Sequence, residues 1–292
     1  MTVIEKAYAK INYYLEISGR RADGYHELET VMQTVSLADT LTVTRVAGEG
    51  ITLETGAALP ADDKNLVVRA ANAYFAASGA PFGCHAVLEK RIPIEAGLGG
   101  GSADAAAMLR ALNRLDKGRF SAAELAEIAV KIGADVPFLI VGGTALCRGV
   151  GEVMTPIEST LHAPIVVAKM GEGVSTPAAF GALDSHFDNF IDFRSDHTPV
   201  PLLAGLQAGD GEAVAASIFN RFEAVVADAR PAVGALLDFL CRAGALAAAM
   251  SGSGPSVFGI FRDAAAAEAA TAALSAMGAD AFACTPTEAI SL

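Results

Sequence analysis

Length and composition describe a globular chain with ample apolar material for a core. The chain has 292 residues, 52% hydrophobic and 18% charged, and its mean hydropathy of +0.41 excludes intrinsic disorder. At roughly 100 to 200 residues per domain, this length predicts one large domain or two ordinary ones. The longest uncharged stretch, residues 243–261, is broken by Gly252, Gly254 and Pro255, and the N-terminus lacks the apolar core of a signal peptide. We therefore expect a cytoplasmic protein without a membrane span.

Charge and cysteine content exclude several classes of ligand. Lysine plus arginine number 21 and aspartate plus glutamate 33, a net charge of −12, so the overall field repels nucleic acids and anionic membranes. Neither is expected as a partner, and any anionic ligand must be held by local structure. The four cysteines, at positions 84, 147, 241 and 284, form no CxxC pair, and the five histidines show no HxH or HExxH spacing. We expect buried free thiols and no metal site built by the protein.

The first half of the chain is predicted to form strands followed by helices. Residues 11–18 alternate between apolar and polar, which is the pattern of a strand with one buried face. Strand-like pieces follow at 31–37, 40–46 and 51–54, separated by glycine and aspartate, and they favour an antiparallel sheet. Helices are predicted over 65–78, 103–115 and 121–132, the last beginning with Ser121 and Glu124 at the spacing of a capping box.

The second half mixes both kinds of element. A strand is predicted over 164–169, mainly helical structure over 199–243, and two strands over 245–250 and 257–261 around a glycine turn. A helix over 264–277, with Asp263 as its N-cap, and a strand over 279–284 follow. Because no regular βαβ repeat appears, the fold class is α+β rather than a doubly wound parallel sheet. The polar stretch 155–163 is the best boundary, which divides the chain into domains 1–158 and 159–292.

A glycine-rich segment carries the strongest chemical signal. Glycine occupies four of the five positions from 97 to 101, and Ser102 leads into the helix predicted over 103–115. Without Cβ atoms, consecutive backbone N–H groups can line a concavity at a helix N-terminus, where the partial positive charge favours phosphate. A flexible linker or cap turn is the plainer alternative, although a linker need not run directly into a helix. The segment matches neither a Walker A loop nor a Rossmann fingerprint, and no protein-kinase catalytic motif is present.

Four further features each allow two interpretations. The Gly/Ser turn 251–256 is either a hairpin loop or a second wall of a phosphate site. Lys10, in the first strand, is either an edge lysine or an inward catalytic charge. Asp135, between a glycine and a proline, is either a rigidly placed carboxylate or an N-cap for a helix starting near Pro137. Tyr25 and His26 follow an Asp-Gly turn and are either surface residues or a stacking and hydrogen-bonding pair for a heterocycle.

Taken together, these motifs resemble the GHMP kinase superfamily. The segments that carry the resemblance are Ala7-Tyr-Ala-Lys-Ile-Asn12, Gly19-Arg-Arg-Ala-Asp-Gly-Tyr-His26, Pro93-Ile-Glu-Ala-Gly-Leu-Gly-Gly-Gly-Ser-Ala-Asp-Ala105, Gly133-Ala-Asp-Val-Pro-Phe138 and Ser251-Gly-Ser-Gly-Pro-Ser256. They occur in order along the chain. Within the superfamily, residues 21–26 are similar to those of members that phosphorylate a cytidine diphosphate-linked polyol rather than mevalonate or homoserine. The resemblance implies a two-domain α+β fold with the active site in the cleft between the domains.

The resemblance also implies a reaction and a set of site residues. The reaction would be ATP-dependent phosphorylation of the 2-hydroxyl of a cytidine diphosphate-linked methylerythritol in isoprenoid precursor biosynthesis, with Mg²⁺ carried mainly by the nucleotide. Asp135 would be the base that faces the acceptor hydroxyl, and Lys10 would lie beside it. The ATP site would comprise Asn65, Leu66, Gly97, Leu98, Gly99, Gly100, Gly101, Ser102 and Ala103. The substrate site would comprise Asn12, Tyr25, His26, Thr176 and Phe180, with Tyr25 and Phe180 flanking the cytosine and His26 hydrogen-bonding it.

The sequence departs from the family at two places. It reads Asn220-Arg-Phe-Glu223 where Asn-Asp-Leu/Phe-Glu is common, and Tyr13 stands where leucine is usual. We therefore assign no catalytic role to residues 220–223. The alternatives are another small-molecule alcohol kinase of the superfamily, a decarboxylase that uses ATP to activate a hydroxyl, and a catalytically silent nucleotide-binding module. Oligomeric state is not encoded in these patterns.

Overall fold

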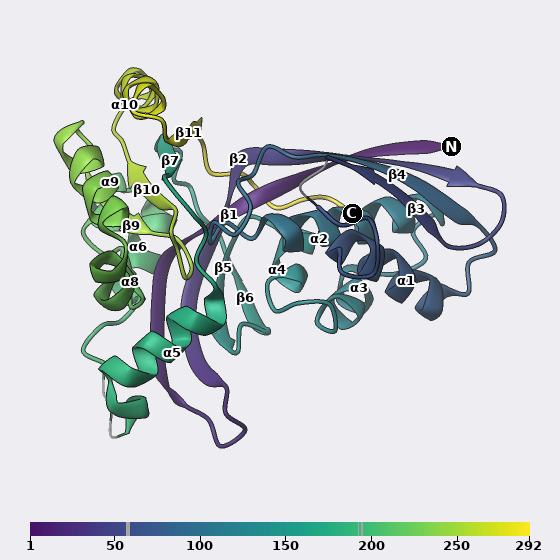
Figure 1. The fold of residues 1–292 in the computed structure, drawn as a ribbon, viewed down its shortest axis with the longest axis horizontal. Coiled ribbons are helices and arrows are strands. Elements are labelled where there is room, and N and C mark those ends of the chain that lie inside the picture. The colour runs from purple at the N-terminus through teal and green to yellow at the C-terminus, as the bar shows by residue number, and fades with distance from the viewer. Residues whose placement is uncertain (57–58, 192, 194) are drawn as a thin grey trace.

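A long antiparallel hairpin runs through the molecule (Figure 1). In the computed structural model, which describes residues 1–56, 59–191, 193 and 195–292, the hairpin consists of β1 (Thr2–Arg20) and β2 (His26–Val46). The seven-stranded sheet built on it has the order β3-β4-β2-β1-β8, with β5 paired to β2 and β6 to β5. Its other strands are β3 (Ile51–Thr55), β4 (Gly83–Glu89), β5 (Thr144–Gly149), β6 (Val153–Ile157) and β8 (Phe219–Asn220). The pieces predicted at 31–37 and 40–46 are parts of the single strand β2.

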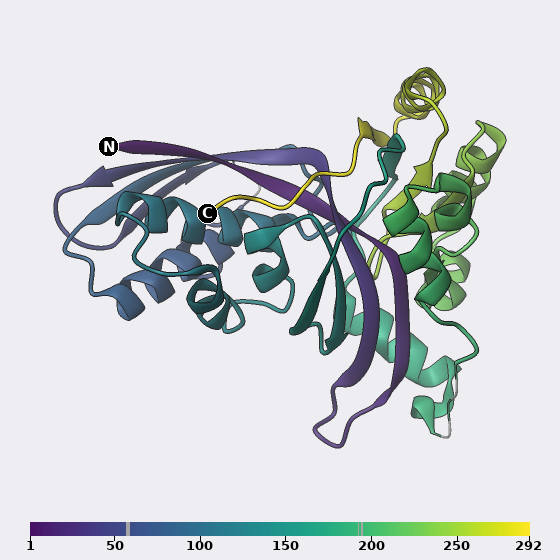
Figure 2. The same ribbon diagram turned by 180° about the vertical axis from the view of Figure 1, so that it is seen from behind.

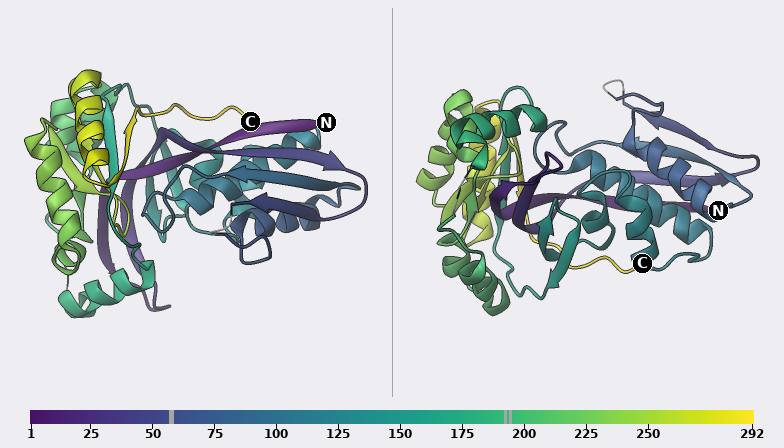
Figure 3. Two further views of the ribbon diagram at one scale, coloured as in Figure 1. Left: turned by 45° about the horizontal axis from the view of Figure 1, so that its top comes forward. Right: turned by 90° about the horizontal axis from the view of Figure 1, so that it is seen from below.

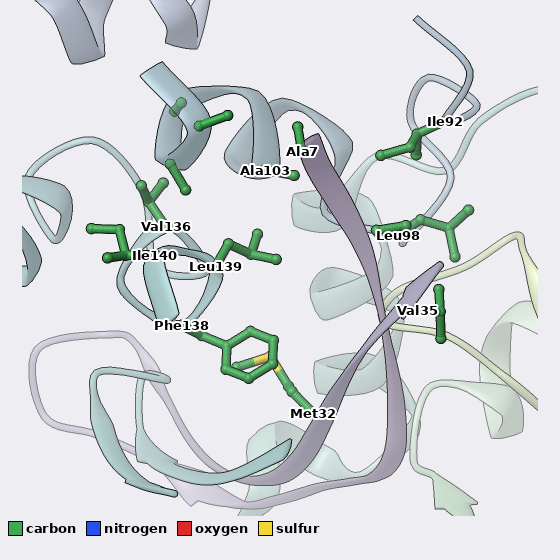
Figure 4. Close-up of a cluster of buried hydrophobic side chains, with 14 of the residues drawn as sticks. Ala7, Met32, Val35, Ile92, Leu98, Ala103, Val136, Phe138, Leu139 and Ile140 are labelled. Atoms are coloured by element: carbon green, nitrogen blue, oxygen red, sulfur yellow. The ribbon is translucent and has the colours of Figure 1, made fainter. Parts of the chain in front are cut away.

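Four helices cover one face of this sheet (Figures 1 and 2). They are α1 (Leu66–Ser78), α2 (Gly100–Leu115), α3 (Ala122–Ala129) and α4 (Val136–Val141). Asn65 caps α1 by accepting a hydrogen bond from the Val67 N–H, and the capping box predicted at Ser121 and Glu124 is present at α3. Figure 4 shows part of the buried cluster beneath them, in which Phe138 and Leu139 of α4 point toward the strands that carry Ala7 and Met32.

Strand β1 is buried on both faces between positions 11 and 17, which corrects the expectation of one buried face. Asn12, Glu16 and Tyr14, the polar positions of the alternating pattern, are as inaccessible as their apolar neighbours. The physical reason is that the hairpin continues beyond the helical layer and packs against the second half of the chain, where Leu15 and Ile17 join another apolar cluster. The polar side chains on this stretch therefore face protein rather than solvent, and they require partners there.

The second half is built on a four-stranded sheet of order β11-β7-β10-β9. Its strands are β7 (Ile165–Lys169), β9 (Ala247–Met250), β10 (Val257–Ile260) and β11 (Asp280–Cys284). Val166 and Ala168 face one apolar cluster and Ile165 and Val167 the other, so β7 is apolar throughout because both of its faces are covered. The helices are α5 (Thr176–His186), α6 (Val200–Ala208), α7 (Gly211–Ala215), α8 (Glu223–Ala229), α9 (Pro231–Arg242) and α10 (Ala264–Ala276), with a short 3₁₀ turn at Asp188–Phe190.

The C-terminal segment returns from the second sheet to the first half (Figure 3). Isolated bridges join Val35 to Pro286 and Gly142 to Ala289, and the Ile290 N–H donates to the Val141 carbonyl at the end of α4. The proposed boundary between residues 158 and 159 lies in the loop between β6 and β7. Because the hairpin and the C-terminal segment both pass between the halves, the two halves share one apolar cluster. Among the described residues, no helix has the length and apolarity needed to cross a bilayer.

Tyr13 gives a stability prediction. Its side chain is fully buried against Phe258, burial raises the pKa of its phenol, and its hydroxyl finds no hydrogen-bond partner among the described residues. Because an unpaired buried hydroxyl is costly, Tyr13→Phe is expected to raise the free energy of unfolding by about 1 kcal/mol. Tyr74→Phe is the matched control and should lower it, since the Tyr74 hydroxyl donates to Asp116 at 3.2 Å. Urea denaturation measures both, and a less stable Tyr13→Phe protein would contradict the assignment.

The cysteines are all free, but only three are buried as expected. Cys241 is exposed because it falls outside the buried stripe of α9, which is formed by Val233, Leu236 and Leu240. Burial raises the pKa of the Cys84 and Cys284 thiols to about 11 and that of Cys147 to about 12. We expect an aromatic disulfide reagent to label one thiol rapidly in the native protein, because thiolate content and access control the reaction. A Cys241→Ser protein should lose that rapid phase, and its persistence would contradict the burial pattern.

Candidate active site

Elements from both halves of the chain line a cleft of about 580 Å³. The first half contributes the hairpin, the start of α2 and the loop before α4, and the second half contributes α5, the start of α8 and the turn between β9 and β10. The sequence-predicted residues that line the cleft are Lys10, Asn12, Asn65, Leu66, Gly97, Gly99, Gly100, Gly101, Ser102, Asp135, Thr176 and Phe180. Four others do not line it: Leu98, Ala103, Tyr25 and His26.

The glycine segment is a turn that becomes a helix three residues earlier than predicted. Gly97 and Gly99 have φ of +74° and +68°, a region that favours glycine, and α2 begins at Gly100. The Ala103 N–H already donates to the Gly99 carbonyl, whereas the N–H groups of the first turn before it have no partner within an α-helix. The cradle for an anion therefore consists of residues 100–102. Leu98 and Ala103 are 1% exposed and belong to the core instead (Figure 4).

The second Gly/Ser turn presses directly on the first. The Ser251 hydroxyl donates to the Gly97 carbonyl at 3.0 Å. A Cβ atom on Gly97 would lie 2.2 Å from the Ser251 carbonyl oxygen. The Gly252 N–H donates to Asn12 Oδ1 at 2.9 Å. A Cβ atom on Gly252 would lie 2.9 Å from the Gly97 carbonyl oxygen, so both backbones require glycine where they meet. Residues 251–256 are the loop of the β9–β10 hairpin and also contribute to the wall of the cleft.

Residues 220–223 hold that second turn in place. Asn220 Nδ2 donates to the carbonyls of Met250 and Gly252, and Glu223 Oε1 accepts from the Met250 N–H. Burial raises the pKa of Glu223. Arg221, which replaces the aspartate common in the family, points elsewhere and forms a bidentate pair with the buried Glu16 at 2.7 and 2.6 Å. The departure from the family therefore lies at a position that supports the hairpin and not at the cleft.

Lys10 and Asp135 lie close together in the cleft. Lys10 is 5% exposed, so the inward interpretation is the one that its burial supports, and its Nζ lies 3.7 Å from Asp135 Oδ2. Lys10 Nζ also donates to Asn12 Oδ1 at 2.8 Å, and Asn12 Nδ2 donates to the Thr30 hydroxyl. Asp135 occupies the N-cap position of α4, but among the described residues its carboxylate makes no capping hydrogen bond and its side chain is 35% exposed. The backbone at the start of α4 fixes the position of Asp135, and its carboxylate is accessible from the cleft.

Helix α5, which the sequence pattern did not predict, also lines the cleft. The Thr176 hydroxyl lies 2.8 Å from that of Ser253, and the Phe180 ring, one turn later, stacks on His26 with centroids 4.6 Å apart. His26 Nε2 lies 2.6 Å from Asp184 Oδ1, also on α5. Tyr25 is 65% exposed at the tip of the hairpin. Phe222 lines the cleft beside Phe180 and was not singled out from the sequence.

A buried charge cluster beside the glycine segment was also missed. Lys90 Nζ donates to Asp39 and, at 2.7 Å, to Asp104 Oδ2. Asp39 also accepts the N–H groups of Arg91 and Ile92. Burial is the largest cause that raises the pKa of Asp104, to about 8; Lys90 opposes the shift and Asp39 adds to it. Lys90 and Asp104 flank the glycine segment in the sequence, but nothing in the local pattern indicates that Asp39 joins them.

Comparisons with known proteins identify the family. Residues 65–143 match the GHMP kinases N terminal domain and residues 202–280 match the GHMP kinases C terminal domain. The chain is 40% identical over 260 residues to a 4-diphosphocytidyl-2-C-methyl-D-erythritol kinase of Caldicellulosiruptor saccharolyticus, covering 89% of this chain and 88% of that protein. It is 42% identical over 275 residues to the kinase of that name from Synechococcus elongatus, covering 90% and 88%.

Solved structures extend the comparison to the fold. A crystal structure of 4-(cytidine 5'-diphospho)-2C-methyl-D-erythritol kinase superposes with a TM-score of 0.84 at 36% identity, covering 97% of this chain and 99% of that one. A homoserine kinase from Cytophaga hutchinsonii shares the fold at a TM-score of 0.76 and 20% identity, covering 99% and 95%. The chain therefore has the two-domain α+β fold of the GHMP kinases and belongs, within them, to the family of 4-diphosphocytidyl-2-C-methyl-D-erythritol kinases.

Proposed function

We propose that this chain transfers the γ-phosphoryl group of ATP to the 2-hydroxyl of 4-diphosphocytidyl-2-C-methyl-D-erythritol. The observation that carries the proposal is the placement of Asp135 and Lys10, 3.7 Å apart, in the same cleft as the anion cradle at residues 100–102. The substrate's identity is supported by relatives of that name at 40% and 42% identity over most of the chain. ATP-dependent phosphorylation of a small molecule is the activity of the family to which the chain belongs.

The chemistry proceeds by direct displacement at phosphorus. The 2-hydroxyl oxygen forms a bond to the γ-phosphorus, the bond to the β,γ-bridging oxygen breaks, ADP leaves, and the hydroxyl proton passes to Asp135. Lys10, fixed by Asn12, holds the acceptor oxygen and offsets charge on the group in transfer. Since phosphoryl transfer has a loose transition state, positioning and charge stabilisation supply most of the rate.

The ligands are assigned to the two ends of the cleft. Asn65 and Leu66 would begin the adenine pocket, beside the cradle at 100–102, and Thr176 would contact the substrate beside the second glycine turn. Phe180 and Tyr25 would flank the cytosine, with His26 hydrogen-bonding it. Support comes from α5, which places Thr176 at the second glycine turn and Phe180 at His26.

Magnesium fits this site as an ion that the nucleotide carries. Among the described residues, no group of three or more His, Cys, Asp or Glu side chains is arranged to hold a metal. Mg²⁺ usually keeps several waters and binds substrate phosphates with few protein ligands, so such a cage is unnecessary. When bound, the ion would neutralise the β and γ oxygens. We further propose a cytoplasmic location, since ATP and the cytidine nucleotide are both charged metabolites that do not cross membranes unaided.

Substrate choice tests the proposal. ADP release is measured with Mg-ATP and 4-diphosphocytidyl-2-C-methyl-D-erythritol, beside mevalonate, homoserine and galactose. We expect turnover with the cytidyl substrate alone. Turnover with another alcohol alone would overturn the assignments of Tyr25, His26 and Phe180. ATP binding without turnover on any alcohol would favour a catalytically silent module, and release of carbon dioxide would indicate a decarboxylase.

A further inference from the structure

The cluster of Asp39, Lys90 and Asp104 carries one more acid than base. Asp39 is 0% exposed and Asp104 is 3% exposed, so neither carboxyl group is solvated. Asp104 Oδ1 is buried and has no hydrogen-bond partner among the described residues. Both carboxyl groups contact the same Lys90 Nζ, so they lie close together, and a proton on Asp104 would remove one of two neighbouring negative charges. The protonated carboxyl would donate to Asp39, and the cluster would then be electrically neutral.

Because this cluster lies beside the anion cradle, its net charge affects nucleotide binding. Asp104 belongs to the first turns of α2, directly after the cradle at 100–102, and both Asp104 and Lys90 line the cleft. Lys90 Nζ lies 3.4 Å from where a Cβ atom on Gly100 would be. An additional negative charge at this place would oppose phosphate binding at the helix N-terminus, where the helix dipole otherwise favours it.

Among the described residues, no other charged side chain forms an ion pair with Asp39, Lys90 or Asp104. The buried side chains of α1 and α4 are apolar apart from Tyr74 and Ser78, neither of which is charged, and the Tyr74 hydroxyl donates to Asp116 near the other end of α2. On β1, Lys10 is engaged with Asn12 and Asp135. Lys64 and Glu95 line the same cleft but neither is paired with Asp104.

We propose that Asp39 and Asp104 share one proton beside Lys90 and that nucleotide binding requires the cluster in this protonated, neutral form. The proposal rests on the assignment of the cleft to ATP, and it makes Asp104 a positioning residue for the nucleotide and not a participant in phosphoryl transfer. Since a bound nucleotide disfavours the ionised cluster, the proton is retained in the complex and is taken up on binding at alkaline pH.

Nucleotide affinity as a function of pH tests this. The dissociation constant of ADP with Mg²⁺, measured by calorimetry from about pH 7 to about pH 9.5, is expected to be flat below about pH 8 and then to rise by up to about tenfold per pH unit. Asp104→Asn cannot ionise and should give a flat profile over the whole range. Glu89→Gln, which removes an exposed carboxylate next to Lys90, should retain the wild-type profile. A wild-type profile without the rise, or an Asp104→Asn profile that keeps it, would overturn the proposal.

A second measurement separates this proposal from the proposed function. The pKa of Asp104 is raised above its ordinary value of 3.8, so the folded state binds more protons than the unfolded state between about pH 4 and about pH 8. The stability of the wild type should therefore fall as pH rises through this window, relative to Asp104→Asn, in urea denaturation. If ADP does not bind at all, the proposed function fails while this stability difference still tests the shared proton. Equal pH dependence in the two proteins would overturn the shared proton itself.

Discussion

Replacing Asp135 by asparagine is expected to lower kcat by about 10²- to 10⁴-fold, the usual contribution of a general base. Asparagine preserves the shape of the side chain and the N-cap position of α4, but it cannot take the proton of the acceptor hydroxyl. Its effect should therefore fall on kcat, with the dissociation constant of ADP changed little. Steady-state kinetics together with ADP calorimetry separates the two quantities.

The control for Asp135→Asn is Glu127→Gln, a substitution of the same kind at an exposed position of α3. It should keep the wild-type kcat. If Asp135→Asn also turned over at nearly the wild-type rate, Asp135 would not be the base. If Asp135→Asn lost ADP binding as well, the loss of activity would reflect a damaged cleft and not a missing proton acceptor.

Gly97→Ala is expected to lower the free energy of unfolding by about 2–4 kcal/mol and to abolish most activity. Gly97 has φ of +74°, where an alanine side chain is strained, and its added Cβ would lie 2.2 Å from the Ser251 carbonyl oxygen. Because that oxygen belongs to backbone, the two glycine turns must move apart. The change therefore separates the walls of the cleft as well as straining one residue.

Gly101→Ala is the matched control for this prediction. The same added methyl group would lie 3.5 Å from Leu66 Cδ1, an ordinary contact, inside the first turn of α2. Its urea midpoint should equal or exceed that of the wild type, since alanine is the better helix former. If Gly97→Ala unfolded at the same midpoint as Gly101→Ala, the close approach of the two turns would not be a feature of the folded protein.

The sequence predicted those parts of the fold that depend on local signals. Ser121 and Glu124 form their capping box, Asp263 caps α10 through the Ala266 N–H, and the strands around the second glycine turn lie close to where they were expected. Helix α5 was missed because few of its residues are buried, so it shows little amphipathic pattern. Polar positions of β1 were expected to face solvent because the alternation does not reveal that the hairpin passes between both halves.

Site residues that lie in a short motif could be predicted from the sequence. Residues that meet only through the pairing of distant strands could not. The glycine segment, Lys10 and Asp135 lie together in the cleft, and each could be predicted because it lies in a short motif that carries the resemblance. Asp39 and Lys90 are 51 positions apart and meet only because β2 and β4 are paired. Tyr25 and His26 were expected together in the substrate site, yet one lies exposed at the hairpin tip and the other is engaged by Phe180 and Asp184. Their roles toward cytosine stay predictions.

The position of the new phosphate is the most direct test of the proposed reaction. ³¹P NMR of the product formed from Mg-ATP and 4-diphosphocytidyl-2-C-methyl-D-erythritol is expected to show an intact cytidine diphosphate and one new phosphate monoester, with carbon coupling that assigns it to C2 of the methylerythritol. Together with the loss of turnover expected for Asp135→Asn, that result would place the 2-hydroxyl at Asp135 and Lys10. A monoester on the ribose, or no monoester while ADP is released, would contradict it.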